Sequence, residues 1–490
     1  MNPAGTRIAL SLISHTNVGK TTLARTLLRK DVGEIRDAPH VTDLSTAHVL
    51  IEDAAGDVLV LWDTPGFGDS ARLLKRLRAA DKPLGWFLSQ VWDRFADRPF
   101  FSSQQAMRNV REEADVVLYL VNAGEDPASA GYVDAEMKIL EWIGKPLILL
   151  LNQTGPPHEA ARDEAEAARW MQHLGEHGFV KAALPLDAFA RCWVQEHRLL
   201  DAIAPQLESA RRAAFDALQS AWRDRDLEIF EQSVATLAEQ LTAAARDVET
   251  LPNRNLGART LAWLKGMGGS ERPADPVVEA ATRRLAERLD HQVRAATARL
   301  LALHGLEGTA ASEVLARLGN EYAVEEPVDP ARAGIIGGAV SGALGGLAAD
   351  VAASGLTFGA GALIGSVLGA IGASGATRAY NLARGREMSA VRWSSGFLTA
   401  RTQAAIVRYL AVAHFGRGRG NYVETECPPH WPAIVGGVLV PRTGELDAIW
   451  RSLANGESPA GTQLQALLRA ALIEVLVRLY PESGPLFAER

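Results

Sequence analysis

The amino-acid sequence predicts an α/β domain with a doubly wound sheet, followed by a mostly α-helical region that contains a Gly/Ala-rich helical hairpin. Two observations predict the α/β domain. The apolar run "RIALSLI" leads through the loop "SHTNVGKTT" into a segment with leucines on one face, which is the pattern of a buried strand, a loop and a helix. A second apolar run, "VLVLW", leads into "DTPGFGD". An apolar stripe at helical spacing after residue 209 predicts the helical region.

Six strands are expected in the α/β domain, separated by turn, loop or helical residues. They fall near residues 7–13, 46–52, 58–63, 115–121, 146–152 and 180–185, with helices between most of them. Sheets of this kind bind their ligands at the carboxyl ends of the strands. We therefore expect the functional residues in the loops that follow these strands.

The loop after the first strand has the features of a phosphate-binding loop, although Ser14 stands where the pattern G-x-x-x-x-G-K-[ST] has its first glycine. Gly19 lets the backbone approach the phosphates, Lys20 supplies a positive charge, and the Thr21 hydroxyl can ligate Mg²⁺. A chance G-K-T in an ordinary loop is the alternative. The residues expected at the phosphates are Ser14, His15, Thr16, Asn17, Val18, Gly19, Lys20, Thr21 and Thr22.

The loop after the third strand supports a nucleotide site. Asp63 ends a buried strand, where it would hold Mg²⁺ through water, and the Gly66 N–H would contact a γ-phosphate. One short motif can match by chance, but two strand-borne motifs in this order are a strong signal. We therefore expect Mg²⁺ as a cofactor, with Thr21 and Asp63 among its ligands.

These two motifs resemble the Era/TrmE-like branch of the small GTPases, whose motifs read G-x-x-N-x-G-K-S and D-T-P-G. The resemblance implies a P-loop GTPase domain that binds GTP and GDP and hydrolyses GTP slowly. It also implies a switch I threonine that closes over Mg²⁺ and the γ-phosphate. Thr42 has the spacing to fill that role, with Thr46 in reserve, and the alternative for both is a solvent-facing loop hydroxyl. The expected catalytic residues are then Lys20 and Thr42.

The resemblance also bears on how GTP would be hydrolysed. Phe67 stands where many small GTPases have a glutamine that orients water. Some members of the Era/TrmE branch use K⁺ held partly by the first-motif asparagine, and Asn17 matches that asparagine. K⁺ is therefore a second expected cation. The alternative is that Asn17 only stabilises its own loop.

The fourth motif departs from the family pattern N-K-x-D, because the chain reads "NQTG" from Asn152 to Gly155. The asparagine that braces the loop is kept, and Gln153 replaces the lysine that packs over the base. Gly155 has no carboxylate to accept hydrogen bonds from guanine, so we expect a GTP preference weaker than the family norm. The fifth motif is also degraded, and Asp187 within it either supplies the lost carboxylate or caps the following helix.

The chain is expected to divide into four parts. These are a GTPase domain over 1–204, a helical domain over 205–330, a Gly-rich hydrophobic hairpin over 331–378 and a C-terminal helical region over 379–490. Helices are predicted over 209–250, 277–303 and 462–480, and the stripe on the first is interpreted as a core seam. Another stripe, from Trp86 to Phe95, either packs on the protein itself or forms a partner surface that responds to the nucleotide.

The segment from Ala333 to Ala376 is apolar and has Asp350 as its only ionisable residue. Its length and its small-xxx-small spacing suit two closely packed membrane helices. Arg332 before it and Arg378 after it would keep both ends in the cytoplasm by the positive-inside rule. The alternative is a tightly packed hairpin in a soluble core, because Gly and Ala contribute little transfer free energy.

Composition limits the compartment and the partners. The net charge of −7 argues against nucleic acid as the main partner. Cys192 and Cys427 are the two cysteines, which excludes a disulfide framework and fits a reducing compartment. The first residues lack the pattern of a signal peptide. We expect a cytoplasmic protein that associates with the inner membrane if the hairpin inserts, and a homodimer through the GTPase domain is a further expectation.

The whole arrangement resembles a bacterial GTPase family whose C-terminal part is known as domain of unknown function 3482. The resemblance assigns no cellular role. The leading hypothesis is a GTP-hydrolysing switch that controls the helical half. The alternatives are a nucleotide-binding scaffold or membrane-remodelling protein without turnover, and a P-loop NTPase of relaxed base specificity.

Overall fold

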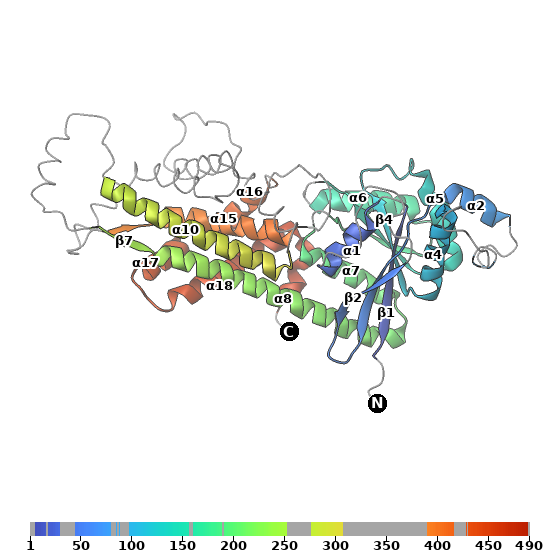
Figure 1. Cartoon of the computed structure of the whole chain (residues 1–490), viewed down its shortest axis with the longest axis horizontal. Coiled ribbons are helices and arrows are strands. Elements are labelled where there is room, and N and C mark those ends of the chain that lie inside the picture. Colours follow the sequence, from blue (N-terminus) through green and yellow to red (C-terminus); the bar gives the residue numbers. More distant parts are fainter. Residues whose placement is uncertain are drawn as a thin grey trace, which may run out of the picture.

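The computed structural model describes residues 5–15, 18–29, 45–79, 85, 88, 98–155, 160–188, 191–251, 276–306, 390–415, 428 and 430–488. Within them, a sheet covered by helices adjoins an elongated bundle of helices (Figure 1). Several predictions lie outside the described residues. They are those on Thr16, Asn17, Thr42, the aromatic stripe from Trp86 to Phe95 and the Gly-rich segment from Ala333 to Ala376.

The α/β domain holds a six-stranded sheet in the order β2-β3-β1-β4-β5-β6. The strands are β1 (Arg7–Ser14), β2 (Thr46–Glu52), β3 (Val58–Asp63), β4 (Val116–Asn122), β5 (Leu147–Asn152) and β6 (Val180–Pro185). All six predicted strands are confirmed, with each end within one residue. The sheet is mixed, because β2 pairs antiparallel with β3 and the other neighbours are parallel. Strand order reverses at β1, where the chain enters the predicted phosphate loop.

Helices cover both faces of this sheet, because its central strands are apolar on both sides. On β5, Ile148 and Leu150 point to one core and Leu147, Leu149 and Leu151 to the other, as the two-residue period of a strand requires. The first core also holds side chains of α1 (Lys20–Leu28) and α7 (Trp193–Ile203). The second holds side chains of α2 (Ser70–Arg78), α4 (Arg98–Glu112), α5 (Gly131–Ile143) and α6 (Ala160–Leu174).

Helix α8 (Ser209–Arg246) has 38 residues and runs from the sheet into the helical bundle (Figure 1). At 1.5 Å per residue it is about 57 Å long. Its apolar stripe divides between two cores: Phe215, Leu218 and Trp222 pack with the sheet, and the residues from Phe230 to Leu241 pack with the bundle. The predicted core seam is confirmed, and one helix is shared by both halves of the chain. The predicted helix end at residue 250 is wrong, because α8 ends at Arg246 and Val248 begins a strand, β7 (Val248–Thr250). The predicted domain boundary at residue 204 stays a prediction.

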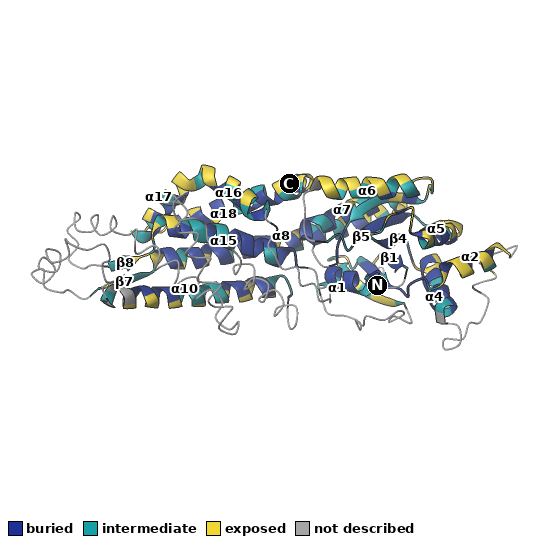
Figure 2. Ribbon diagram, turned by 90° about the horizontal axis from the view of Figure 1, so that it is seen from above, coloured by how far each residue is buried: buried dark blue, intermediate teal, exposed yellow. Residues whose placement is uncertain are grey.

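Around α8 the bundle contains α10 (Pro276–Leu303), α15 (Ser395–Ala413), α16 (His430–Leu439), α17 (Thr443–Ala454) and α18 (Ala460–Leu479). Short 3-10 helices lie at Ala204–Gln206, Val440–Arg442 and Pro481–Phe487. A two-stranded ribbon of β7 (Val248–Thr250) and β8 (Ala390–Arg392) closes the far end. Figure 2 shows the buried sides of these helices turned toward one another. The helices predicted over 277–303 and 462–480 are confirmed as α10 and α18.

Among the described residues, α18 is the one helix long and apolar enough to cross a membrane. Its leucines, including Leu464, Leu468, Leu472 and Leu476, are buried in the core of the bundle. Core helices of soluble proteins have the same composition. Packing in the bundle therefore accounts for the apolar character of α18.

Candidate nucleotide-binding site

The phosphate loop, residues 14–22, connects β1 to α1. Gly19 has φ of +93°, and α1 begins at the next residue, Lys20. A β-carbon on residue 19 would lie 2.8 Å from the Nδ2 atom of Asn152. Glycine is therefore required at position 19 for two reasons: the backbone there is left-handed, and the Asn152 side chain approaches closely.

Lys20 is buried, with 8% of its surface exposed, and its Nζ donates a hydrogen bond to the Ser14 Oγ at 3.0 Å. The serine that replaces the usual glycine thus holds the lysine by a side-chain contact that glycine lacks. Burial lowers the pKa of Lys20, while the negative charges of Asp63 and Glu136 act in the opposite direction. Two carboxylates therefore lie near one ammonium group in this pocket.

Thr21 and Asp63 lie together, as a shared Mg²⁺ site requires. The Thr21 Oγ1 donates to the Asp63 Oδ2 at 2.8 Å. The Asp63 Oδ1 is buried and has no hydrogen-bond partner among the described residues. Mg²⁺ in nucleotide sites is usually held by one or two protein oxygens together with phosphates and water. The orphaned carboxylate oxygen beside a hydroxyl therefore fits Mg²⁺.

The carboxylate of Asp63 is also electrostatically tied to the lysine. Burial raises the pKa of Asp63, and the charge of Lys20 and the hydrogen bond from Thr21 oppose this shift. Thr46, the reserve switch I residue, is the β2 residue paired with Asp63 and is exposed. Residue 46 thus lies on the strand adjacent to β3, directly opposite the predicted metal ligand Asp63.

The loop after β3 is joined to the phosphate loop through its backbone. The Phe67 N–H donates to the Ser14 carbonyl at 2.9 Å, and His15 forms a parallel bridge with Phe67. The Phe67 side chain is fully buried among the residues of the second core. A buried phenyl ring cannot orient an attacking water, so position 67 supplies no substitute for the glutamine of other small GTPases.

Asn152, at the end of β5, forms hydrogen bonds to two loops. Its Nδ2 donates to the Val18 carbonyl at 2.7 Å, and its Oδ1 accepts from the Ala188 N–H at 2.8 Å. It therefore ties the phosphate loop to the loop after β6. Gln153 follows with φ of +58°, in the left-handed region.

Asp187 reaches the fourth-motif loop from the loop after β6. It is buried, and its Oδ2 accepts from the Thr154 N–H at 2.7 Å and from the Thr154 Oγ1 at 2.9 Å. The N-cap of α7 is Cys192, so the interpretation of Asp187 as a helix cap is wrong. Gly155 has φ of +89°, and nothing among the described residues lies within 4 Å of where its β-carbon would be.

Two family models match the chain. Residues 10–153 match a model described as a 50S ribosome-binding GTPase, and residues 174–456 match a domain of unknown function, DUF3482. The second match covers more than half of the chain. The chain belongs to the DUF3482 family. Its α/β domain is a GTP-binding, Era-like GTPase domain, and the resemblance that the motifs indicated is confirmed.

Solved structures similar to this DUF3482 protein include two of Era and one of NFeoB. A variant of Era from Aquifex aeolicus bound to GDP·AlF4⁻ is 15% identical, with 51% of this chain and 74% of that chain covered and a TM-score of 0.31. Era in complex with MgGDPNP and a 16S ribosomal RNA segment is 16% identical, with 51% of this chain and 74% of that chain covered and a TM-score of 0.30. The mGMPPNP-bound structure of NFeoB from S. thermophilus is 14% identical, with 48% of this chain and 71% of that chain covered and a TM-score of 0.23. No curated protein matches the chain.

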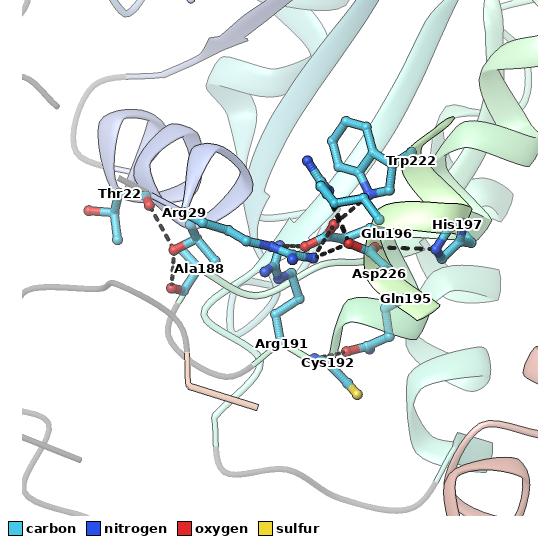
Figure 3. A network of polar contacts seen from close by, with 12 residues as sticks. Thr22, Arg29, Ala188, Arg191, Cys192, Gln195, Glu196, His197, Trp222 and Asp226 are labelled. Atoms are coloured by element: carbon cyan, nitrogen blue, oxygen red, sulfur yellow. Dashed lines mark hydrogen bonds and ion pairs between the residues drawn. The ribbon is translucent and has the colours of Figure 1, made fainter. Parts of the chain in front are cut away.

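A buried ionic network joins the GTPase domain to the DUF3482 part of the chain (Figure 3). Arg29, the C-cap residue of α1, contacts the Asp226 Oδ1 on α8 at 2.8 Å and the Glu196 Oε2 on α7 at 3.4 Å. Glu196 also pairs with Arg191 and accepts from the Trp222 Nε1 at 3.0 Å. Both carboxylates are almost completely buried. The network therefore connects the end of the phosphate-binding helix to the helix shared by both cores.

Burial alone would raise the pKa of Asp226. The charge of Arg29 and the close contact with the His197 ring together hold that pKa below its usual value, so the carboxylate is ionised. This network was not among the features predicted from the sequence. The signal was present, because Asp226 lies four residues from Trp222 and four from Phe230, on the buried face of a helix where an unpaired charge would be unfavourable.

Proposed function

We propose that this protein is a GTP-hydrolysing molecular switch whose nucleotide state is passed to its helical half through α8. The observation that carries the proposal is the contact between Arg29 and Asp226. It ties the last turn of the phosphate-binding helix to a helix that contributes to both cores. Arg29 immediately precedes the segment that contains Thr42, the expected switch I threonine.

The residues of the site have distinct roles in this proposal. The phosphate-loop backbone N–H groups and Lys20 bind the β- and γ-phosphates. Thr21 and Asp63 hold Mg²⁺, which when bound neutralises negative charge on the phosphate oxygens. Phe67 cannot orient water, so we propose slow turnover, with K⁺ near Asn17 and the hydroxyl of Thr42 completing the site around the γ-phosphate.

Transmission to the helical half follows from the rigidity of α8. When switch I closes over the γ-phosphate, the end of α1 is held in one position, and Arg29 holds Asp226 with it. A continuous helix of about 57 Å moves as one body, so a small displacement at Asp226 reaches the far end of the bundle. The helical half would therefore differ between its GTP and GDP states.

Replacing Lys20 by alanine should weaken GTP binding about 10- to 100-fold, because charge-assisted hydrogen bonds to phosphate are lost. Hydrolysis should become undetectable. Labelled-nucleotide binding and phosphate release, each measured in KCl and in NaCl, test this. Lys138→Ala, an exposed lysine on α5, is the matched control. Equal binding by the wild type and Lys20→Ala would remove the nucleotide assignment, and binding without turnover in either salt would favour the scaffold.

Relaxed base specificity is a second candidate, favoured by Gly155. The fourth motif presents no carboxylate at that position, and the carboxylate of Asp187 is held by Thr154. The missing carboxylate would accept hydrogen bonds from guanine. Its absence should reduce discrimination between GTP and ATP by about 10- to 100-fold relative to a site that keeps it. Competition of ATP against bound GTP measures this. We expect GTP to remain preferred, and equal competition would leave a nucleotide switch without guanine specificity.

A further inference from the structure

Glu136 is a fully buried carboxylate beside the phosphate loop, on a helix that carries none of the nucleotide motifs. It lies on α5, and among the described residues three side chains contact it. The His15 Nδ1 lies 2.7 Å from its Oε1, the Ser70 Oγ donates to the same oxygen, and the Tyr119 hydroxyl donates to its Oε2 at 2.6 Å. These partners come from the phosphate loop, the start of α2 and β4.

Such a carboxylate is stable only when its donors are all in place. Burying a charge without hydrogen bonds is strongly unfavourable, and removing one donor leaves the group under-satisfied. The His15 ring is fixed further, because it stacks on Tyr132 with ring centroids 4.3 Å apart. Glu136 therefore holds the positions of the phosphate loop and of α2 relative to each other.

The segment between Asp63 and α2 has three more attachments among the described residues. The Thr64 Oγ1 donates to the Leu12 carbonyl on β1 at 2.7 Å. The Phe67 N–H donates to the Ser14 carbonyl, and the Gly68 N–H donates to the Ser103 Oγ on α4 at 3.2 Å. A β-carbon on Gly68 would meet Pro99 at 2.5 Å, so this backbone lies directly against α4. The segment that carries Gly66 is thus fixed at both of its ends, with Glu136 at the end nearest α2.

We propose that Glu136 is a positioning residue that holds the Gly66–Ser70 segment against the phosphate loop, so that Gly66 is presented to the γ-phosphate. The proposal rests on the proposed GTPase function. Contacts to the β-phosphate come from the phosphate loop and Lys20 and remain when α2 shifts. The link from Glu136 through Ser70 to α2 therefore acts on the GTP-bound state and on hydrolysis, and its removal should have little effect on GDP binding.

Ser70→Ala is the most specific test, because it removes the link from Glu136 to α2 and keeps the link to His15. We expect kcat for GTP to fall about 10-fold, since a displacement of about 1 Å in a reacting site can cost up to 100-fold. Affinity for a non-hydrolysable GTP analogue should fall relative to GDP, with GDP affinity within about twofold of the wild type. Glu136→Leu should lower kcat further, and it should also weaken GDP binding, because it removes the contact to His15 of the phosphate loop as well. Glu136→Gln, which keeps one acceptor oxygen, should fall between Glu136→Leu and the wild type.

One control separates positioning from a general effect of mutation on this helix. Glu141→Gln changes an exposed glutamate on α5 and should keep kcat within about twofold of the wild type. A parallel fall of GDP and GTP-analogue affinity in Ser70→Ala would overturn the proposal, as would a loss of kcat in Glu141→Gln equal to that in Ser70→Ala. If the wild type shows no turnover, the proposed hydrolysis fails, and the ratio of analogue to GDP affinity still decides the role of Glu136.

Discussion

Asp226→Asn should lower the free energy of unfolding by about 3–5 kcal/mol, the usual cost of removing one partner from a buried ion pair. The carboxylate faces Arg29 at 2.8 Å and Arg225 at 3.1 Å, and His197 lies 3.3 Å away. The asparagine amide has nearly the same shape, so the change is mainly electrostatic. Without the negative charge, the carboxylate left for Arg29 among the described residues of the network would be Glu196, which Arg29 shares with Arg191.

Urea unfolding of the full chain, followed by circular dichroism and tryptophan fluorescence, measures this loss. Asp224→Asn is the matched control, because residue 224 is exposed on the same helix, two positions away. It should change the free energy of unfolding by less than about 0.5 kcal/mol. Similar losses in the two variants would show that Asp226 has no special place in the network. The pair Arg29→Met with Asp226→Leu should recover much of the stability, since apolar residues can replace a buried ion pair.

Acidification from pH 6.5 to pH 5 should lower the free energy of unfolding of the helical half by about 1.5–3 kcal/mol. Burial lowers the pKa of His414 to about 4, and the same effect, with the nearby charge of Arg29, lowers the pKa of His304 to about 3. The His414 Nδ1 lies 2.7 Å from the Leu410 carbonyl, and its Nε2 lies 2.7 Å from the Tyr480 hydroxyl. A neutral ring satisfies both contacts by donating to the carbonyl and accepting from the hydroxyl.

The direction follows from where protons bind. In the unfolded chain both rings titrate near the ordinary histidine pKa of 6.5, so the unfolded state binds more protons than the folded state below that value. Stability therefore falls as the pH drops from 6.5, and the loss from His414 ends near pH 4. His304 is partly accessible to solvent, so its contribution is the smaller part of the range.

Thermal melting of the full chain at pH 7, 6 and 5 checks this expectation. His414→Gln removes the titrating ring, so its melting temperature should vary less with pH than that of the wild type. His291→Gln, an exposed histidine on α10, should leave the pH dependence unchanged. If the wild type and His414→Gln lose stability in parallel between pH 7 and pH 5, His414 is not the group responsible.

The strands could be predicted to within one residue because their signal is local. Buried strands such as Leu147–Asn152 are uninterrupted apolar runs that end in loop residues. The phosphate loop was predictable for the same reason, because Gly19, Lys20 and Thr21 are consecutive residues of one strand–loop–helix unit. The sequence also determined what the site lacks, namely a glutamine at position 67 and a carboxylate at position 155.

Pairing across long separations was decided only by the tertiary structure. His15 and Glu136 are 121 positions apart, and Arg29 and Asp226 are 197 apart, so no periodicity or motif relates them. The same holds for the division of one apolar stripe on α8 between two cores. Apolar spacing reports that a face is buried, but it carries no information on what buries it. Partners are selected by shape and charge after the chain has folded back on itself, and those contacts link the nucleotide site to the helical half.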